Sequence, residues 1–342
     1  MVCMGTTLDQ DGIQRCLVSR KLNSIITIEF IKHYNKMEHI EEIIKSVTTR
    51  NEQPISTGIK FLDDAIGGYY PGEMTTICGE ECCCKTAFII HQVCRIAIDQ
   101  KIPTVVLLNY MTERNFLSSM IAYYCNIETK DIHSVLYSEK YKENVNSFLN
   151  ILKESPLYVA KAGWYEDKRI TEGLGNLIEL KNIKIMFVDE VILDLRPSDI
   201  AGLSCIQTIA IKNKIPVVVT CNVWNDREGL AGVRPSLTDV SRCSYLHGHD
   251  VVIGFTNYEQ HGIIIDEHGS NLKGIIGIEI LKHRGKLSEN MCNIPKDYFY
   301  IRDYEQKRKQ ALEELRKSGG MIVESLIKKL DLSVEECEQL PF

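Results

Sequence analysis

The segment GEECCCKTAF, Gly79–Phe88, contains the residue types of a loop that binds phosphate groups. Such a loop reads Gly, four free positions, Gly, Lys and then Ser or Thr. Its backbone N–H groups and the N-terminus of the following helix converge on the phosphate oxygens, while Lys reaches the outer phosphates and Ser or Thr holds Mg²⁺. The sequence therefore predicts a nucleotide site formed by Gly79, Glu80, Glu81, Cys82, Cys83, Cys84, Lys85 and Thr86.

One residue of this loop departs from the pattern, because Cys84 stands where the second glycine belongs. The change disfavours binding if that position needs a positive φ, or if a side chain there collides with phosphate. Cysteine is small, so we expect weaker rather than abolished nucleotide binding. The surrounding sequence supports the loop, since an apolar strand, MTTIC, precedes it and an apolar helix, TAFIIHQVCRIAI, follows it.

The cysteine triplet itself allows several interpretations. Adjacent residues on an extended backbone point apart, and metal ligands are usually spaced as in C-x-x-C, so a metal site is disfavoured. A redox switch is one alternative, because a thiol at a helix N-terminus has a lowered pKa and a raised reactivity. The other is that small residues are tolerated in a loop with relaxed demands.

The segment between Pro54 and Arg302 alternates short β-branched strands with longer helices, which predicts a mostly parallel sheet covered on both faces. The expected strands are MTTICG, IPTVVLLNYM, SPLYVAKA, IKIMFVDEVI, IPVVVTCN and HDVVIGFTN, and we expect GIIIDEHG and GIIGIEILKHRG to form a hairpin of edge strands. Residues 1–53 predict a helical extension. Residues 303–342 predict a helical tail, in which Ser333 and Glu336 form a capping box.

The composition sets limits on partners and compartment. The 342 residues include 40 Lys and Arg against 46 Asp and Glu, a net charge of -6, so no global basic field attracts nucleic acid. The 13 cysteines are scattered and no secretory signal precedes them, which favours free thiols in a reducing cytoplasm. The apolar runs fall short of the roughly 18 residues needed to cross a bilayer, so we expect no membrane partner.

The run in front of the loop, ISTGIKFLDDAIGGYYPGEMTTICGE, resembles the entry to the RecA-like motor domain of DnaB-type replicative DNA helicases. The resemblance covers about Pro54 to Arg302 and continues through NYMTERNFLSSMIAYYCNI, SPLYVAKA, KIMFVDE, KIPVVVTCNVWN, RPSLTDV, HDVVIGF and ILKHRG. It implies an α/β, RecA-like core with a mostly parallel central sheet flanked by helices, and small helical N- and C-terminal extensions. RadA-like and KaiC-like ATPases share this core and are the alternatives.

The resemblance also implies ligands and roles. It implies that ATP and Mg²⁺ bind, with Lys85 and Thr86 as the phosphate and metal residues. Asp189, at the end of IKIMFVD, is similar to the Walker B carboxylate that orders the water shell of the metal. The alternative for Asp189 is a helix N-cap. Asn222 stands where the family has a Gln that senses the γ-phosphate, so an amide is kept on a shorter stem.

Two further positions concern hydrolysis. Lys282 and Arg284 match a Lys-x-Arg pair that family members insert into the nucleotide site of the neighbouring subunit, which implies a homo-oligomeric ring, a hexamer in the family. Hydrolysis also needs a carboxylate to orient or deprotonate water. The helicases place a Glu where Tyr110 aligns here, and Glu113 follows three residues later. We take Glu113 as the candidate base, the alternative being an ordinary first-turn Glu.

The DNA-binding parts of the helicases are reduced in this sequence. The interval EVILDLRPSDIAG after Asp189 has Arg196 as its sole basic residue, where helicases carry a long basic loop. The first 50 or so residues are also too few for the family's large N-terminal domain. We expect an ATP hydrolase, a ring-shaped DNA helicase or translocase that acts on single-stranded DNA with other replication proteins. The alternative is a catalytically impaired relative that serves as a nucleotide-binding scaffold or regulator.

Overall fold

The computed structural model describes residues 40–41, 53–127, 139–161, 168–191, 206–223, 233–243, 248–266, 268–288, 290–302, 304, 306 and 309–310. The chain divides into two units, Met1–Glu52 and Gln53–Phe342. The helical extensions expected at residues 1–53 and 303–342, with the capping box at Ser333, lie almost entirely outside the described residues. These boundaries therefore stay predictions.

Six parallel strands form the centre of the second unit, in the order β3-β2-β4-β5-β1-β6. They are β1 (Met74–Gly79), β2 (Thr104–Leu108), β3 (Leu157–Lys161), β4 (Ile185–Val191), β5 (Val217–Asn222) and β6 (Val251–Asn257). Every residue of β1 and β2 is buried, as expected of β-branched strands covered on both faces. Each of these strands lies within a segment where the sequence predicts one, and the mostly parallel sheet is confirmed.

The predicted hairpin of edge strands is wrong. β7 (Ile275–His283) lies inside the sheet, antiparallel to β6, and its other side pairs with β8 (Lys286–Leu287) and β9 (Met291–Pro295). The segment GIIIDEHG contributes only an isolated bridge from Ile265 to Asn271. The reason is local, because the Asp266 carboxylate accepts hydrogen bonds from the N–H groups of His268 and Ser270, at 2.9 Å and 2.7 Å. These bonds turn the chain before a strand can extend.

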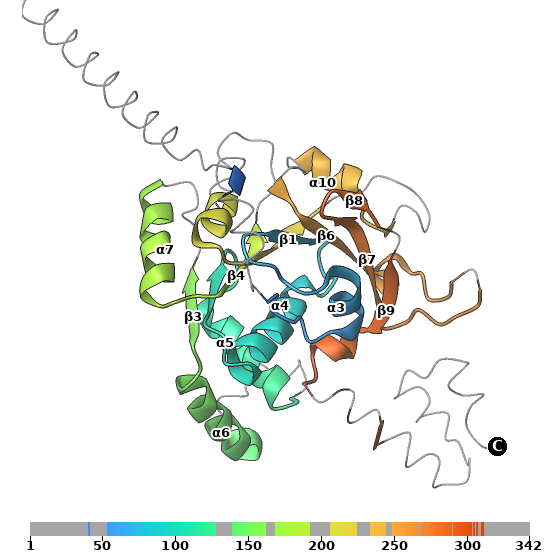
Figure 1. Ribbon diagram of the computed structural model, residues 1–342. Helices are drawn as coiled ribbons and strands as arrows, with labels where there is room; N and C mark the ends of the chain where they lie inside the picture. Colours follow the sequence, from blue (N-terminus) through green and yellow to red (C-terminus); the bar gives the residue numbers. More distant parts are fainter. Residues whose placement is uncertain are drawn as a thin grey trace, which may run out of the picture. The chain divides into compact units, whose positions relative to one another are not determined.

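Helices cover both faces of the sheet (Figure 1). The core of one face contains residues of α3 (Lys60–Ile66), α4 (Lys85–Val93), α5 (Glu113–Tyr124) and α6 (Lys142–Lys153). The core of the other face contains residues of α7 (Lys168–Leu180) and of the helix at 206–213. α10 (Leu237–Cys243) packs with a smaller cluster around Cys78 and Cys221. The two-sided cover predicted from the sequence is therefore present.

The helix after the nucleotide loop is anchored in the first of these cores. α4 continues as a π-helix, Cys94–Asp99, and the Phe88 ring packs edge-on against Phe255 and Phe299, with ring centroids 5.2 Å and 5.6 Å apart. Phe299 belongs to a 3₁₀-helix, Lys296–Phe299, that follows β9. These contacts fix α4 to the sheet and so fix the loop at its N-terminus. Among the described residues, no helix is both long and apolar enough to cross a membrane.

Candidate nucleotide-binding site

The loop that joins β1 to α4 has the geometry of a phosphate-binding loop. A Cβ atom on Gly79 would lie 2.5 Å from the Phe255 carbonyl oxygen and 2.6 Å from Cys83 Sγ, so only glycine fits. Phe88 N–H donates the first bond of α4, to the Cys84 carbonyl at 2.9 Å. The preceding N–H groups of a helix have no acceptor within it, and they form a site for an anion.

Lys85 is buried with its amine inside this loop. Its Nζ donates to the carbonyl oxygens of Gly79 and Glu80, at 3.0 Å and 2.5 Å, and to Cys83 Sγ at 3.4 Å. A residue that follows β6 also contacts the loop: His261 Nε2 lies 2.8 Å from the Glu80 carboxylate. The Lys85 amine therefore lies within the loop, where the pattern predicts the phosphate-binding lysine.

Cys84 adopts the conformation for which the pattern calls for glycine. Its φ is 69°, in the left-handed region, and the φ of Cys82 is 60°. A residue with a Cβ atom reaches this region at a cost of roughly 1–2 kcal/mol. Position 84 does therefore need a positive φ, and the cysteine adopts it without changing the course of the loop.

Two thiols of the triplet, those of Cys83 and Cys84, have a raised pKa, whereas a redox switch needs a lowered one. Burial raises the pKa of Cys83 to about 11, although the Lys85 charge opposes the shift. Burial also raises the pKa of Cys84, against a hydrogen bond with Tyr300, whose hydroxyl lies 3.7 Å from Sγ. For these two residues desolvation opposes the activation expected at a helix N-terminus, which disfavours the redox switch.

Thr86 and Asp189 form a hydrogen-bonded pair beside the loop. Thr86 Oγ1 donates to both carboxylate oxygens of Asp189, each at 3.2 Å, and Thr220 Oγ1 donates to Oδ1 at 3.0 Å. Asp189 is 3% exposed, and burial raises its pKa to about 6, while the Thr220 and Thr86 bonds oppose this rise. A hydroxyl and a carboxylate suit Mg²⁺, which keeps several of its waters. The described residues contain no separate cluster of three His, Cys, Asp or Glu side chains for a metal.

Asn222 lies at the end of β5, directly beside Gly79 in the sheet. Its Nδ2 donates to Glu190 Oε1 at 2.9 Å, and its buried Oδ1 has no hydrogen-bond partner among the described residues. Glu190 also donates its N–H to Thr220 Oγ1 at 2.7 Å. The sequence analysis missed Glu190, and the one signal available was its place directly after Asp189. The structure thus brings Thr86, Asp189, Asn222 and Glu190 together at one edge of the sheet.

Glu113, the candidate base, is not part of this group. It is the exposed first residue of α5, after Thr112, whose Oγ1 accepts a hydrogen bond from Asn115 N–H at 3.2 Å. None of the described hydrogen bonds around Asp189 involves Glu113. Tyr110 is 61% exposed. Glu113 lies in the first turn of α5, as the alternative describes, and its role as the base stays a prediction.

Lys282 and Arg284 lie at the opposite edge of the sheet from the loop. Lys282 Nζ donates to the His249 carbonyl at 2.5 Å, and Arg284 Nε donates to the Glu73 carboxylate at 2.8 Å. Glu73 precedes β1, whereas the loop follows it. A strand of this length spans about 17 Å. Neither cation can therefore reach the loop of its own chain.

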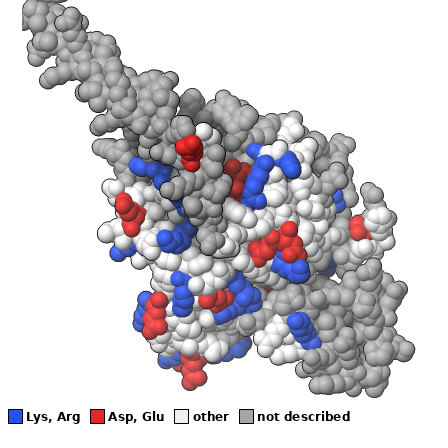
Figure 2. Space-filling view, in the orientation of Figure 1, with Lys and Arg blue, Asp and Glu red and all other residues white. Residues whose placement is uncertain are grey.

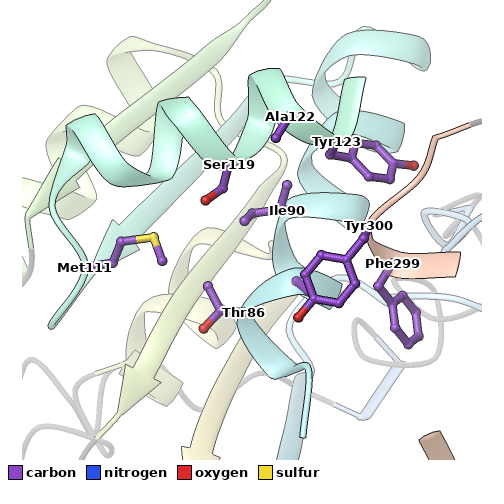
Figure 3. A pocket seen from close by; sticks show the side chains of 9 residues that line it. Thr86, Ile90, Met111, Ser119, Ala122, Tyr123, Phe299 and Tyr300 are labelled. Carbon is purple, nitrogen blue, oxygen red and sulfur yellow. The ribbon is translucent and has the colours of Figure 1, made fainter. Parts of the chain in front are cut away.

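A pocket of about 170 Å³ opens beside Thr86, between α4, α5 and the segment at Phe299 and Tyr300. Figure 3 shows Met111 to one side of Thr86 and the Tyr300 ring to the other. The remaining lining comes from Ala87, Ile90, Ser119, Ala122, Tyr123 and Phe299. The loop therefore has free space on the flank of α4.

The face of the molecule in Figure 2 bears on DNA binding. On the face in Figure 2, the described Lys and Arg side chains are interspersed with Asp and Glu, and they form no continuous basic stripe. Arg196 and the short interval after Val191 lie outside the described residues. The expectation of a reduced DNA loop therefore stays a prediction.

A parallel sheet with a phosphate loop after β1 and a buried carboxylate at the end of β4 defines a RecA-like P-loop domain. The chain belongs to the DnaB-like helicase C-terminal domain family, whose sequence profile matches residues 54–294. This confirms the predicted resemblance, and it favours the DnaB-like family over the RadA-like and KaiC-like alternatives.

A curated relative and two solved structures agree with this assignment. The chain is 23% identical over 273 residues to the replicative DNA helicase DnaB of Treponema pallidum (strain Nichols), a match that covers 75% of this chain and 61% of the relative. A structure of a DnaB-like replicative helicase, described with its interactions with primase, superposes with a TM-score of 0.59 at 14% identity, covering 74% of this chain and 62% of the other. A second solved structure, described as an ATPase domain, gives a TM-score of 0.59 at 16% identity, covering 76% of this chain and 95% of the other. These likenesses confirm the RecA-like fold.

Proposed function

We propose that this chain binds ATP with Mg²⁺ and hydrolyses it as the motor domain of a ring-forming DNA helicase or translocase. The observation that carries the proposal is the convergence of three elements on one site. The end of β1 supplies the loop, α4 supplies Lys85 and Thr86, and β4 supplies Asp189, 3.2 Å from the Thr86 hydroxyl. Membership of the DnaB-like family supports the same function.

The side chains at the site have separable tasks in this proposal. The N-terminus of α4 and the Lys85 amine bind the phosphates, for which Lys85 exchanges its bonds to the Gly79 and Glu80 carbonyls. Thr86 and Asp189 are placed to hold Mg²⁺, which neutralises charge on the phosphate oxygens when bound. Because the pKa of Asp189 is raised only to about 6, the carboxylate is still largely ionised at neutral pH and can take this role.

The positions of Lys282 and Arg284 in the sheet support a ring of several subunits. Both lie at the sheet edge away from the loop of their own chain, so a contribution to catalysis requires the loop of a neighbouring copy. We propose a homo-oligomeric ring, a hexamer by analogy with the family, with a nucleotide site between adjacent subunits. We further propose that the ring acts on single-stranded DNA together with other replication proteins, and that it does so in the cytoplasm. The relative described with primase supports such partners for this fold.

The proposal is tested by steady-state ATP hydrolysis of the full chain with Mg²⁺, with and without single-stranded DNA. Lys85→Ala removes the charged donor to the phosphates, worth roughly 1.5–3 kcal/mol, and we expect hydrolysis to fall at least tenfold. Lys153→Ala, at the exposed C-terminal end of α6, is the matched control and should leave the rate unchanged. Absent turnover in the wild type, or equal turnover in Lys85→Ala, contradicts the proposal.

A second candidate function is a nucleotide-binding scaffold or regulator without hydrolysis. The observation that favours it is the exposed Tyr110, which occupies the place of the family's catalytic acid, together with the location of Glu113 outside the site. Saturable ATP binding without turnover in the same assay would support this candidate over the motor.

A further inference from the structure

The orientation of β4 side chains changes at the point where the strand meets the site. Side chains on a strand alternate between the faces of a sheet. Phe187 packs in the same core as Phe88 of α4, and Val188 packs in the core of the opposite face. Regular alternation would continue with Asp189 facing α4 and Glu190 facing away.

A bulge in β4 breaks this alternation. The pairing with β5 shifts between Val188 and Val191, so that Asp189 and Glu190 together oppose the single residue Thr220. Val191 then returns to the core of the face opposite α4. Bulges of this kind redirect a side chain and are over-represented next to active sites.

The redirected side chain is Glu190. Thr220 and Asn222 lie two and four residues after Val218, which packs in the α4 core, so they share its face of β5. The Glu190 N–H is bonded to the Thr220 hydroxyl, and Glu190 Oε1 accepts a hydrogen bond from Asn222 Nδ2 at 2.9 Å. The carboxylate therefore lies on the same face of the sheet as Asp189, α4 and the loop.

Glu190 is held in this position against the preference of its backbone. Its φ is 66°, a left-handed conformation that a residue with a long side chain rarely adopts. Such conformations persist when surrounding bonds enforce them, and they cluster at active sites. Here the enforcing contacts are the Thr220 hydroxyl, the Asn222 amide and the Asn109 amide, which donates to the Glu190 carbonyl at 2.9 Å.

We propose that Glu190 is the carboxylate that activates the attacking water. It would replace the catalytic Glu of the helicases, whose position aligns with Tyr110 here, and Asn222 would be its positioning residue. The inference rests on the proposed ATP hydrolysis. Glu190 is only half-buried, so water can reach it. Asn222 holds the carboxylate through the hydrogen bond from its Nδ2 to Glu190 Oε1.

The step balances with ATP and water alone. The water oxygen forms a bond to the γ-phosphorus while the bond from that phosphorus to the bridging oxygen of ADP breaks. Glu190 takes one proton from the water, and the electron pair of the broken bond stays on ADP. The proton then passes from Glu190 to solvent, and ADP and phosphate leave.

The test compares Glu190→Gln with Glu113→Gln in the full chain, by steady-state hydrolysis and by equilibrium binding of ATP with Mg²⁺. Gln keeps the size of the side chain and can still accept from Asn222. We expect Glu190→Gln to lower kcat by about 100-fold or more, and to leave ATP binding within about threefold of wild type. Lost turnover in Glu113→Gln together with wild-type turnover in Glu190→Gln would assign the base to Glu113 and overturn the role of Glu190. Asn222→Ala should lower kcat much more than it changes KM.

A further variant separates catalysis from a structural role. Glu190→Gly removes the carboxylate and also relieves the positive φ, so we expect lost turnover with a Tm equal to or above that of the wild type. Wild-type turnover that is abolished by Lys85→Ala but unaffected by Glu190→Gln overturns the role of Glu190 and leaves the proposed function standing. Absent wild-type turnover overturns both. A lowered Tm together with unchanged turnover in Glu190→Gly shows a structural role only.

Discussion

At the scale of single residues, Cys84 shows how a substitution can preserve a loop while straining it. The residue takes φ 69°, the conformation that the glycine of the pattern adopts freely, and its thiol lies against the Tyr300 hydroxyl. Surrounding contacts restrict the backbone conformation of the loop, because there is no room for a side chain at Gly79 and Lys85 binds the loop carbonyls. The fold therefore forces the cysteine into the required conformation at a cost in stability.

This strain predicts a difference between two substitutions. Cys84→Gly relieves the positive φ and Cys84→Ala keeps it, while both remove the thiol. We expect the Gly variant to be more stable than the Ala variant by about 1 kcal/mol, because only the backbone conformation separates them. The free energy of unfolding from urea denaturation measures the difference. An Ala variant as stable as the Gly variant would show that position 84 carries no backbone strain.

At the scale of elements, the sequence was sufficient to predict the central strands and the position of the loop. The β-branched runs of β1, β4 and β5 are buried on both faces, and their apolar composition alone identifies such strands. The carboxyl ends of parallel strands meet at one edge, so Asp189 and Asn222 could be placed near the loop.

Other features of the site depend on contacts that composition does not record. The bulge at Asp189 and Glu190 exists because Thr220 bonds to both residues, and no local pattern predicts that pairing. The failed strand at GIIIDEHG depends on the bonds to the Asp266 carboxylate. The role of Glu113 stays a prediction, because the alignment specifies only a sequence position and α5 begins with this residue at an exposed site.

Two buried histidines, His91 in α4 and His249, predict that the stability of the fold depends on pH. His91 is buried among Tyr123, Tyr298 and Phe299, and burial, helped by the Arg95 charge, lowers its pKa from 6.5 to about 3. Burial also lowers the pKa of His249, to about 4. The unfolded chain binds protons below pH 6.5 that the folded chain does not, so the free energy of unfolding falls as pH drops from 6.5 towards 3. Well below pH 6.5, one such group contributes about 1.4 kcal/mol per pH unit.

His91→Leu should remove the contribution of this histidine to the pH dependence of the free energy of unfolding. We expect a shallower fall in the free energy of unfolding between pH 6 and pH 4, by about 1 kcal/mol per pH unit, measured by urea denaturation at several pH values. His268→Leu, at an exposed position, is the control and should keep the wild-type slope. An unchanged slope in His91→Leu would contradict a neutral buried imidazole.

At the scale of the whole molecule, the two halves of the proposed catalytic machinery lie at opposite edges of one sheet. The loop, Asp189 and Glu190 lie at the carboxyl edge, and Arg284 lies beside Glu73 at the start of β1. The Arg284 bond to Glu73 is partly exposed and contributes at most about 1 kcal/mol. Arg284 also donates to the Ile66 carbonyl at 3.0 Å and lies over the Tyr70 ring, so a role in trans requires it to exchange these contacts as well. Under the proposed role of Arg284 in trans, a complete site requires two copies of the chain.

This arrangement predicts complementation between two impaired variants. Arg284→Ala keeps its loop and Lys85→Ala keeps its arginine, so adjacent copies in a mixed ring rebuild an intact site. In an equal mixture that assembles at random, about a quarter of the interfaces are intact, and we expect about that share of wild-type hydrolysis. Lys286→Ala, on neighbouring β8, should be active alone. Full activity of Arg284→Ala alone, or no recovery in the mixture, would exclude a role in trans.

The central claim, that this loop holds a nucleotide with its metal, is tested most directly by equilibrium binding of ATP to the full chain. We expect saturable binding of one ATP per chain with Mg²⁺, weaker binding when a chelator removes the metal, and affinity at least tenfold lower in Lys85→Ala. Binding that is absent from the wild type, or that is equal in Lys85→Ala, would contradict the claim.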